Sequence, residues 1–292
     1  MPSRVQPRKV LESLRQAAID ELGEARATNA GIPQRLHTTA AHHALPTRLA
    51  ANWQRIRAMH PLWDVRLYDN QDIARFISAS YGPATLALYQ LVNPRYGAAR
   101  ADLFRYLCIY RQGGVYLDVK STTLVPLHDW LTPQDSYILS QWDHADPRYP
   151  DWGHHAALRH IPGGEYQQWF VAASAGHPLM RAVLLAVFEN IAQYRALPPR
   201  FGKMGVYEVT GPIAYSLAIH DALGTTQPPP SHRHCMVERD GWLAYNCLGR
   251  PDGHVTPDVP HYSRLKEPVV QLGMMDLALF HTVRAWQQMG QD

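Results

Sequence analysis

The sequence predicts an α/β fold in which a mostly parallel sheet is flanked by helices. Short apolar or β-branched runs alternate with longer segments of helical periodicity, and strands that alternate with helices form mainly parallel sheets. The run AARADLFRYLCIYRQGGVYLDVKSTT, residues 98–123, is the most informative. It places a helix, a Gly-Gly cap, a short strand and an aspartate one after another.

The individual elements follow from the same patterns. An amphipathic helix is predicted over residues 8–27, because Leu11, Leu14, Ala18 and Leu22 recur at helical spacing. Strands are predicted at residues 32–39, 63–68, 115–117, 137–142 and 168–173, and helices over 45–60, from Asp69-Asn70 onward, over 83–92, 98–112 and 177–194, and from Pro212 onward. LPPR and FGKMG, within residues 197–205, are expected to interrupt this pattern.

Two regions are predicted to be rich in loops. Residues 143–164 are polar and contain four histidines and a Gly-Gly pair, and loops of this length are often lids or binding loops. Beyond residue 227 the pattern weakens, with short strands expected at 235–237 and 242–245. The chain is therefore divided into an N-terminal helical extension, residues 1–30, and one domain, residues 31–292, with a loop-rich C-terminal part.

Composition excludes several classes of protein. The formal net charge is +3 over 292 residues and no long basic block occurs, so nucleic acid is not an expected partner. The three cysteines are far apart, which argues against a disulfide framework or a thiolate zinc site. Neither a signal peptide nor an apolar run of about 18 residues is present. The protein is expected in the cytoplasm, with peripheral membrane contact through the first helix left open.

The central run also holds the candidate site. Asp118 follows the predicted strand at its carboxyl end, which in α/β sheets faces the crevice where ligands bind. Asp102 and Arg105 lie at i, i+3 spacing on the preceding helix. From the residues alone, Asp118 capping a turn and Asp102 with Arg105 forming a surface ion pair remain alternatives.

Five blocks of the chain, in order, resemble the family-32 glycosyltransferases, which have the GT-A fold. They are IPQRLHTT, WQRIRAMHPLWDVRLYDN, ARADLFRYLCIYRQGGVYLDVKS, QWFVAASAGHPLM and VTGPIAYSLAI, within residues 32–222. The resemblance implies a retaining glycosyltransferase of polysaccharide biosynthesis, which moves a sugar from a nucleotide-sugar donor to a hydroxyl of a glycan, polysaccharide or small-molecule acceptor. A divalent metal, Mn²⁺ or Mg²⁺, usually binds the diphosphate in this family.

The resemblance assigns site residues by motif. Asp118 corresponds to the first aspartate of the D-x-D motif, with a catalytic and metal-binding role. The resemblance also implies that six residues contact the nucleotide-sugar donor: His37, Asp102, Arg105, Tyr116, Thr210 and Gly211. His261, in a late loop, is a further candidate metal ligand.

Lys120 departs from the motif, because it stands where the second aspartate would be. An ammonium group offers no oxygen ligand and repels a cation. It can, however, supply positive charge to a departing diphosphate, which is the task of the metal. Asp118 and Lys120 are therefore the predicted catalytic pair, and a metal cofactor is doubtful.

Two other functions stay open. A non-catalytic relative that binds nucleotide sugars or glycans would also account for Lys120. A phosphatase of the haloacid-dehalogenase type would use Asp118 and Thr122 as the first and last positions of D-x-D-x-T, although the second aspartate is missing there too.

Overall fold

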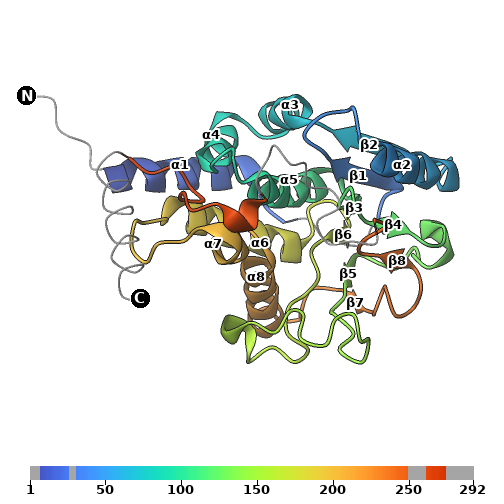
Figure 1. Ribbon diagram of the computed structural model, residues 1–292. Coiled ribbons are helices and arrows are strands. Elements are labelled where there is room, and N and C mark those ends of the chain that lie inside the picture. Colours follow the sequence, from blue (N-terminus) through green and yellow to red (C-terminus); the bar gives the residue numbers. More distant parts are fainter. Residues whose placement is uncertain (1–6, 26–30, 249–260, 274–292) are drawn as a thin grey trace, which may run out of the picture.

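A six-stranded sheet forms the centre of the computed structural model, which describes residues 7–25, 31–248 and 261–273 (Figure 1). Its strand order is β2-β1-β3-β6-β5-β7. β1 pairs in parallel with β2 and β3, and β5 with β7, whereas β6 is antiparallel to both β3 and β5. Five strands thus point one way, which confirms the prediction of a mostly parallel sheet. The strands are β1 (Arg35–Thr39), β2 (Asp64–Tyr68), β3 (Gly114–Leu117), β5 (Tyr137–Leu139), β6 (Phe170–Ala173) and β7 (Arg233–His234).

Helices cover both faces of this sheet. In the described residues they are α1 (Pro7–Leu22), α2 (Thr47–Met59), α3 (Asn70–Ser80), α4 (Pro83–Leu91), α5 (Gly97–Gln112), α6 (Pro178–Ala192), α7 (Gly202–Val209) and α8 (Pro212–Thr225). A separate two-stranded ribbon joins β4 (Thr122–Thr123) to β8 (Leu243–Ala244). None of the helices in these ranges is both long and apolar enough to cross a bilayer.

The alternation of side chains along the strands divides the core in two. On β3, Tyr116 belongs to the large cluster formed with α1 and α3 to α8, whereas Val115 and Leu117 belong to a second cluster with α2 and the β4–β8 ribbon. Successive side chains of a strand point to opposite faces, so a strand buried on both faces is apolar throughout. The short run Val-Tyr-Leu was readable as a strand for this reason.

Helix α5 lies at the middle of the larger cluster, and its residues Asp102 to Tyr110 are all buried. The helix ends at Gly113, which has φ +65° and donates its N–H to the carbonyl of Ile109 (2.8 Å). Gly114, with φ +100°, starts β3 directly afterwards. Both glycines occupy the left-handed region that other residues avoid, so the chain reverses from helix to strand without a loop.

Two features differ from the predictions or go beyond them. The segment around FGKMG does not simply interrupt the pattern, because most of it forms the start of α7. Close packing explains the difference: a Cβ at Gly205 would lie 2.7 Å from the Arg200 carbonyl carbon. Ala18 and Leu22 of α1 are buried in the larger cluster, and α1 packs on α4 and α6. The division at residue 30 stays a prediction.

The strand directions bring one set of segments to a single edge of the sheet. β1, β2, β3, β5 and β7 all end there, and the reversed β6 begins there. We call this the carboxyl edge. The chain connections run from β1 outward to β2 and then back to β3 on the other side of β1, so the order reverses between β1 and β3. In open α/β sheets, ligands bind at such a reversal.

Replacing Gly114 by Ala is expected to destabilise the protein by at least about 2 kcal/mol. A Cβ there would lie 2.5 Å from the carbonyl oxygen of Arg35, and the backbone φ is +100°. Gly224→Ala is the matched control, because no atom lies within 4 Å of its Cβ position and it is in α8. Urea unfolding of both variants measures the difference; equal free energies of unfolding would contradict the strain.

Candidate active site at the carboxyl edge

Arg105 is the centre of a polar cluster beneath the carboxyl edge. Its side chain is 4% exposed and makes ion pairs with two carboxylates, at 2.8 Å to Asp118 Oδ1 and 3.2 Å to Asp102 Oδ1. It also donates to the backbone oxygen of Gln168 and, at 2.7 Å, to Gln168 Oε1. The ring of Tyr116 lies below the guanidinium, 4.7 Å from centroid to Cζ. A planar, always charged group with five donors suits this many partners.

Asp102 is held entirely by the protein. Gln168 Nε2 donates to its Oδ1 at 3.2 Å, Thr210 Oγ1 donates to Oδ2 at 3.0 Å, and Arg105 forms an ion pair with Oδ1. Burial raises the pKa of this carboxyl from its ordinary 3.8 to about 6, even though Arg105 acts in the opposite direction. The buried pair is therefore ionised near neutral pH, and the two hydrogen bonds together with the Arg105 charge compensate for the lost water.

Asp118 is the exposed member of the cluster, with 24% of its side chain accessible. Its N–H donates to the Trp169 carbonyl (2.8 Å), which continues the β3–β6 pairing by one residue. Its own carbonyl accepts from the Ser121 N–H (2.8 Å), so Asp118 to Ser121 form a tight turn. Arg105 thus fixes one oxygen of Asp118, and the carboxylate stays partly exposed at the carboxyl edge.

Lys120 lies in this turn and is directed by the β4–β8 ribbon. Its Nζ donates to Tyr245 Oη at 2.7 Å and lies 4.3 Å from the centre of that ring. Two further bonds tie the turn to the segment after β8: Cys247 N–H to the Lys120 carbonyl and Ser121 Oγ to the Tyr245 carbonyl, each 2.8 Å. These contacts therefore hold the ammonium group of Lys120 in the same turn that begins with Asp118.

The other predicted site residues are placed differently. Thr210 ends α7 inside the cluster and Gly211 precedes α8, where a Cβ would lie 2.9 Å from Tyr207 Cα. His37 is fully buried, with Nδ1 3.2 Å from Tyr68 Oη and Nε2 3.1 Å from the Gly113 carbonyl, and burial lowers its pKa to about 4. It is therefore committed to contacts within the core. Its role as a donor contact stays a prediction.

His261 begins the short 3-10 helix at residues 262–264, where its Nδ1 accepts from the Ser263 N–H. The next residue, Tyr262, has its pKa raised by burial and by the negative charges of Asp102 and Asp118. The segment therefore approaches the cluster, as expected for a late site loop. No group of three ligand side chains in the described residues joins His261 to Asp118, so the metal role of either residue remains a prediction.

Sequence reasoning missed three residues of the site. Gln168 bonds both Arg105 and Asp102, Tyr245 receives Lys120, and Glu165 accepts from Trp142 Nε1 (2.6 Å) and pairs with His155 (2.9 Å). Gln168 and Glu165 precede the antiparallel strand β6. That strand brings its amino end to the carboxyl edge, so recognising its reversed direction would have identified them.

The donor set around Asp118 does not fit a divalent cation. One of its oxygens is bound by Arg105, and Lys120 stands where a second carboxylate is required. Among the described residues, one group of three side chains has ligand atoms close enough together for a metal: His43, Asp69 and Asp72, within 4.8 Å. These carboxylates already cap α3, however, since Asp69 accepts from two N–H groups and Asp72 from the Asp69 N–H.

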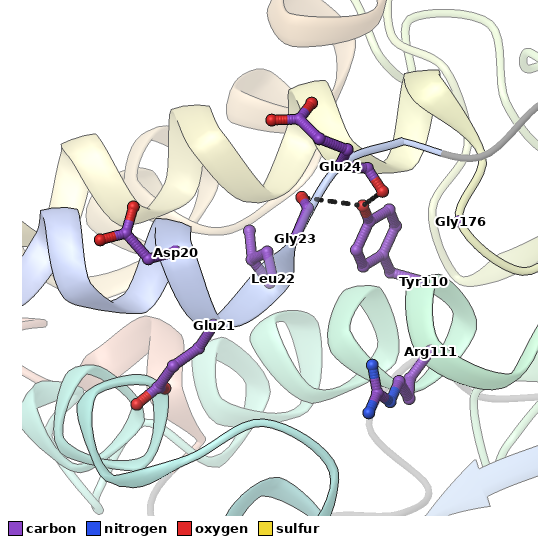
Figure 2. A pocket seen from close by; sticks show the side chains of 8 residues that line it. All are labelled: Asp20, Glu21, Leu22, Gly23, Glu24, Tyr110, Arg111 and Gly176. Carbon is purple, nitrogen blue, oxygen red and sulfur yellow. Dashed lines mark hydrogen bonds between the residues drawn. The ribbon is translucent and has the colours of Figure 1, made fainter.

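A cavity lies away from this cluster. It has a volume of about 290 Å³ and lies between the end of α1, the last turn of α5 and Gly176 (Figure 2). Its lining holds three carboxylates, Asp20, Glu21 and Glu24, against one cation, Arg111, so its net charge is negative and disfavours phosphate. Tyr110 Oη donates across it to the carbonyls of Gly23 (3.5 Å) and Glu24 (3.1 Å). The last turn of α5 leads into the start of β3, whereas Asp118 follows its end, so the cavity is not part of the site.

A sheet that is mostly parallel, with a carboxylate–guanidinium cluster at its carboxyl edge, is the architecture of an α/β protein that binds a polar ligand at a strand reversal. Comparison with known proteins gives a match to a family model over part of the chain. Residues 46–137 match the model described as "Glycosyltransferase sugar-binding region containing DXD motif". The matched range includes Asp102, Arg105, Asp118 and Lys120. Residues 46–137 are thus similar to this glycosyltransferase sugar-binding region, which confirms the resemblance noted in the sequence.

The curated relatives have related names. The "Initiation-specific alpha-1,6-mannosyltransferase" of Schizosaccharomyces pombe is 26% identical over 216 residues, which are 70% of this chain and 52% of that protein. The "Inositol phosphoceramide mannosyltransferase 3" of the same organism is 27% identical over 192 residues, 65% and 45% respectively. The aligned part thus spans about half the length of these relatives. Among solved structures, "PaToxG Glycosyltransferase" aligns with a TM-score of 0.48 and 13% identity over 74% of this chain and 79% of that one.

Replacing Arg105 by Met is expected to reduce the free energy of unfolding by about 3 kcal/mol at pH 8, because Asp102 is then a buried charge without its cation. The loss should be smaller at pH 5, where Asp102 is mostly protonated. Adding Asp102→Asn to Arg105→Met should recover much of the loss. Guanidinium unfolding at both pH values tests this, and an equal loss at both would mean that Asp102 is not the group concerned.

The raised pKa of Asp102 also sets a pH dependence of stability. Because its folded pKa, about 6, lies above its ordinary 3.8, its contribution is fully present below about pH 4 and is lost as the pH rises to 6. Two pKa units correspond to roughly 3 kcal/mol. Relative to Asp102→Asn, the wild type should therefore lose stability between pH 4 and 6 and change little above. A gain over this range would show that the attraction of Arg105 outweighs burial.

Proposed function

We propose that this protein is a retaining glycosyltransferase that moves a sugar from a nucleotide-sugar donor to an acceptor hydroxyl. One observation carries the proposal: within the matched sugar-binding region, Arg105 holds the exposed carboxylate of Asp118 at the strand reversal, with Lys120 in the same turn. The relatives named above are mannosyltransferases. A nucleoside diphosphate–mannose is therefore the first donor to test.

The different exposures of the charged groups suggest which of them contact the donor and which position other side chains. Asp118 and Lys120, both partly exposed, meet the ribose and diphosphate of the donor. Asp102 and Arg105, each 4% exposed at the side chain, position Asp118, Gln168 and Thr210 around the sugar instead of reaching far into the site themselves. Such a fixed arrangement of charges costs no reorganisation when the reaction begins.

The transfer follows from this arrangement. The bond between the anomeric carbon and the diphosphate oxygen breaks, and the acceptor oxygen forms its bond on the same face of the sugar. The proton of the acceptor hydroxyl passes to the departing phosphate oxygen, so no protein side chain is assigned as the base. Lys120 stabilises the negative charge that develops on the diphosphate. We accordingly propose that transfer does not depend on a divalent metal.

A panel of nucleotide sugars, assayed for transfer and hydrolysis with Mn²⁺, with Mg²⁺ and with EDTA, tests the function. The proposal expects one donor to be consumed in all three conditions. Activity that occurs with Mn²⁺ or Mg²⁺ but is absent with EDTA would show that Lys120 does not replace the metal. The proposed glycosyltransferase function would still stand. Binding of a donor without transfer or hydrolysis would favour the non-catalytic relative, which Lys120 also suits. No binding of any nucleotide sugar would contradict the proposal.

Lys120→Ala is expected to weaken binding of the nucleoside diphosphate about tenfold or more, because a charge-assisted bond to phosphate is lost. Tyr245→Phe should weaken it less, since Phe keeps the ring under the ammonium but removes the oxygen that accepts from it. Lys9→Ala, on the exposed face of α1, is the control. Calorimetric titration of the diphosphate measures all three. Unchanged affinity in Lys120→Ala would refute the assignment.

A further inference from the structure

Five aromatic side chains form a continuous cluster at the carboxyl edge, next to the proposed donor site. They come from segments far apart in the sequence: the end of β5, the loop of residues 143–164, the residue before β6 and the segment after β8. Ring centroids of neighbours lie 4.8–5.7 Å apart, within the range of favourable aromatic pairs. We call it the aromatic cluster: Trp142, Tyr149, Trp152, Trp169 and Tyr245.

The cluster connects the Lys120 ammonium to the molecular surface. Tyr245 lies between them, because its oxygen accepts from Lys120 Nζ at 2.7 Å and its ring is 5.7 Å from that of Trp152. Trp152 is 38% exposed and is the one aromatic among the large apolar side chains that stay exposed in residues 7–25, 31–248 and 261–273. An exposed indole therefore lies one side chain away from the group proposed to hold the diphosphate.

The loop holds this indole in place. Gly153, with φ +80°, allows the chain to turn directly after Trp152, and its carbonyl accepts from the Glu165 N–H (3.1 Å). The Trp152 carbonyl lies 2.9 Å from His144 Nε2. Glu165 joins the two sides of the loop through Trp142 Nε1 and His155. The exposed ring is thus presented by a bonded framework, which reduces the entropy lost on binding a ligand.

The surroundings indicate what such a ring would bind. Polar and titratable side chains border Trp152. His144 bonds its carbonyl, the ring of His154 lies 4.1 Å from that of His144 and is tilted by 47° to it, and the His155–Glu165 pair follows. An apolar surface set among hydrogen-bonding groups suits a ligand with an apolar face and polar edges. A pyranose ring has C–H groups on its faces and hydroxyls around its rim. A hydrocarbon chain would leave the neighbouring polar groups without partners.

We propose that Trp152, backed by Tyr245, forms the acceptor subsite and stacks on a sugar ring of a glycan acceptor. The inference rests on the proposed function, because Lys120 marks the donor side and Trp152 the side from which the acceptor hydroxyl arrives. It names the acceptor class, a carbohydrate, and makes Trp152 a residue that determines specificity. The loop of residues 143–164, predicted from its length and composition to be a binding loop, would then serve the acceptor.

Two substitutions separate stacking from packing. Trp152→Leu keeps an apolar side chain against Trp142 and Tyr149 but removes the ring, whereas Trp152→Phe keeps a ring. With manno-oligosaccharides as acceptors, Trp152→Leu is expected to raise the acceptor KM about three- to tenfold, the size of an aromatic stacking contribution. Trp152→Phe should restore most of it, and the donor KM should stay within about twofold. Leu62→Ala, 86% exposed ahead of β2, is the control.

Direct titration of the same oligosaccharides, followed by tryptophan fluorescence, keeps the two proposals distinguishable. If the chain uses no nucleotide sugar, the proposed function fails, but weaker oligosaccharide binding in Trp152→Leu than in Trp152→Phe would still support the subsite. Transfer to a lipid or other non-carbohydrate acceptor that is unaffected by Trp152→Leu would overturn the subsite and leave the function intact. An equal acceptor KM in Trp152→Leu and the wild type would overturn it as well.

Discussion

The neutralisation of two carboxylates by one buried guanidinium is the interaction on which the site depends. Asp102 is buried, and without a cation it would take up a proton instead of accepting its two hydrogen bonds as a carboxylate. Arg105 supplies that cation, and the same Nη2 that approaches Asp102 also donates to Asp118. Buried ion pairs seldom stabilise a fold on balance. Here the pair fixes the orientation of the partly exposed Asp118 carboxylate, so its role is to position that group.

The topology of the sheet explains why such a cluster can reach a ligand. Five strands end at the same edge, and β6 begins there, so loops from distant parts of the chain meet around Asp118. The turn after β3 carries Lys120, and the β4–β8 ribbon brings Tyr245 to it. Where the D-x-D motif has its second aspartate, this turn carries the ammonium group of Lys120, which is a positive charge and not a metal ligand. Tyr245 holds that charge in place.

The order of elements and the position of Asp118 were readable from local patterns. Gly113 and Gly114 mark the end of a helix because few other residues adopt positive φ, and the strand Val-Tyr-Leu is apolar because both faces of the sheet are covered. The reversed direction of β6 leaves no such local signal, since a buried strand is apolar whichever way it runs. The contacts of Gln168 and Glu165 were therefore hidden, and so was the pairing of Lys120 with Tyr245, 125 residues away.

His37 illustrates a limit of another kind. A histidine in the first strand resembles a ligand-binding residue in its chemistry, but its position within the strand, not at its end, directs it into the core against Tyr68. Burial then favours the neutral ring. Periodicity predicts which face a side chain takes, whereas the partner that it meets depends on distant segments of the chain, here the end of β2 and the residue after α5.

A crystal structure of the chain with a nucleoside diphosphate sugar, grown without divalent metal, tests the central claim most directly. The account predicts that the diphosphate lies within hydrogen-bond distance of Lys120 Nζ, that Asp118 contacts the ribose or sugar, and that Asp102 and Arg105 keep their mutual ion pair. A diphosphate bound elsewhere, such as beside His43 and Asp72, or a Lys120 that stays on Tyr245 and makes no phosphate contact, would contradict it.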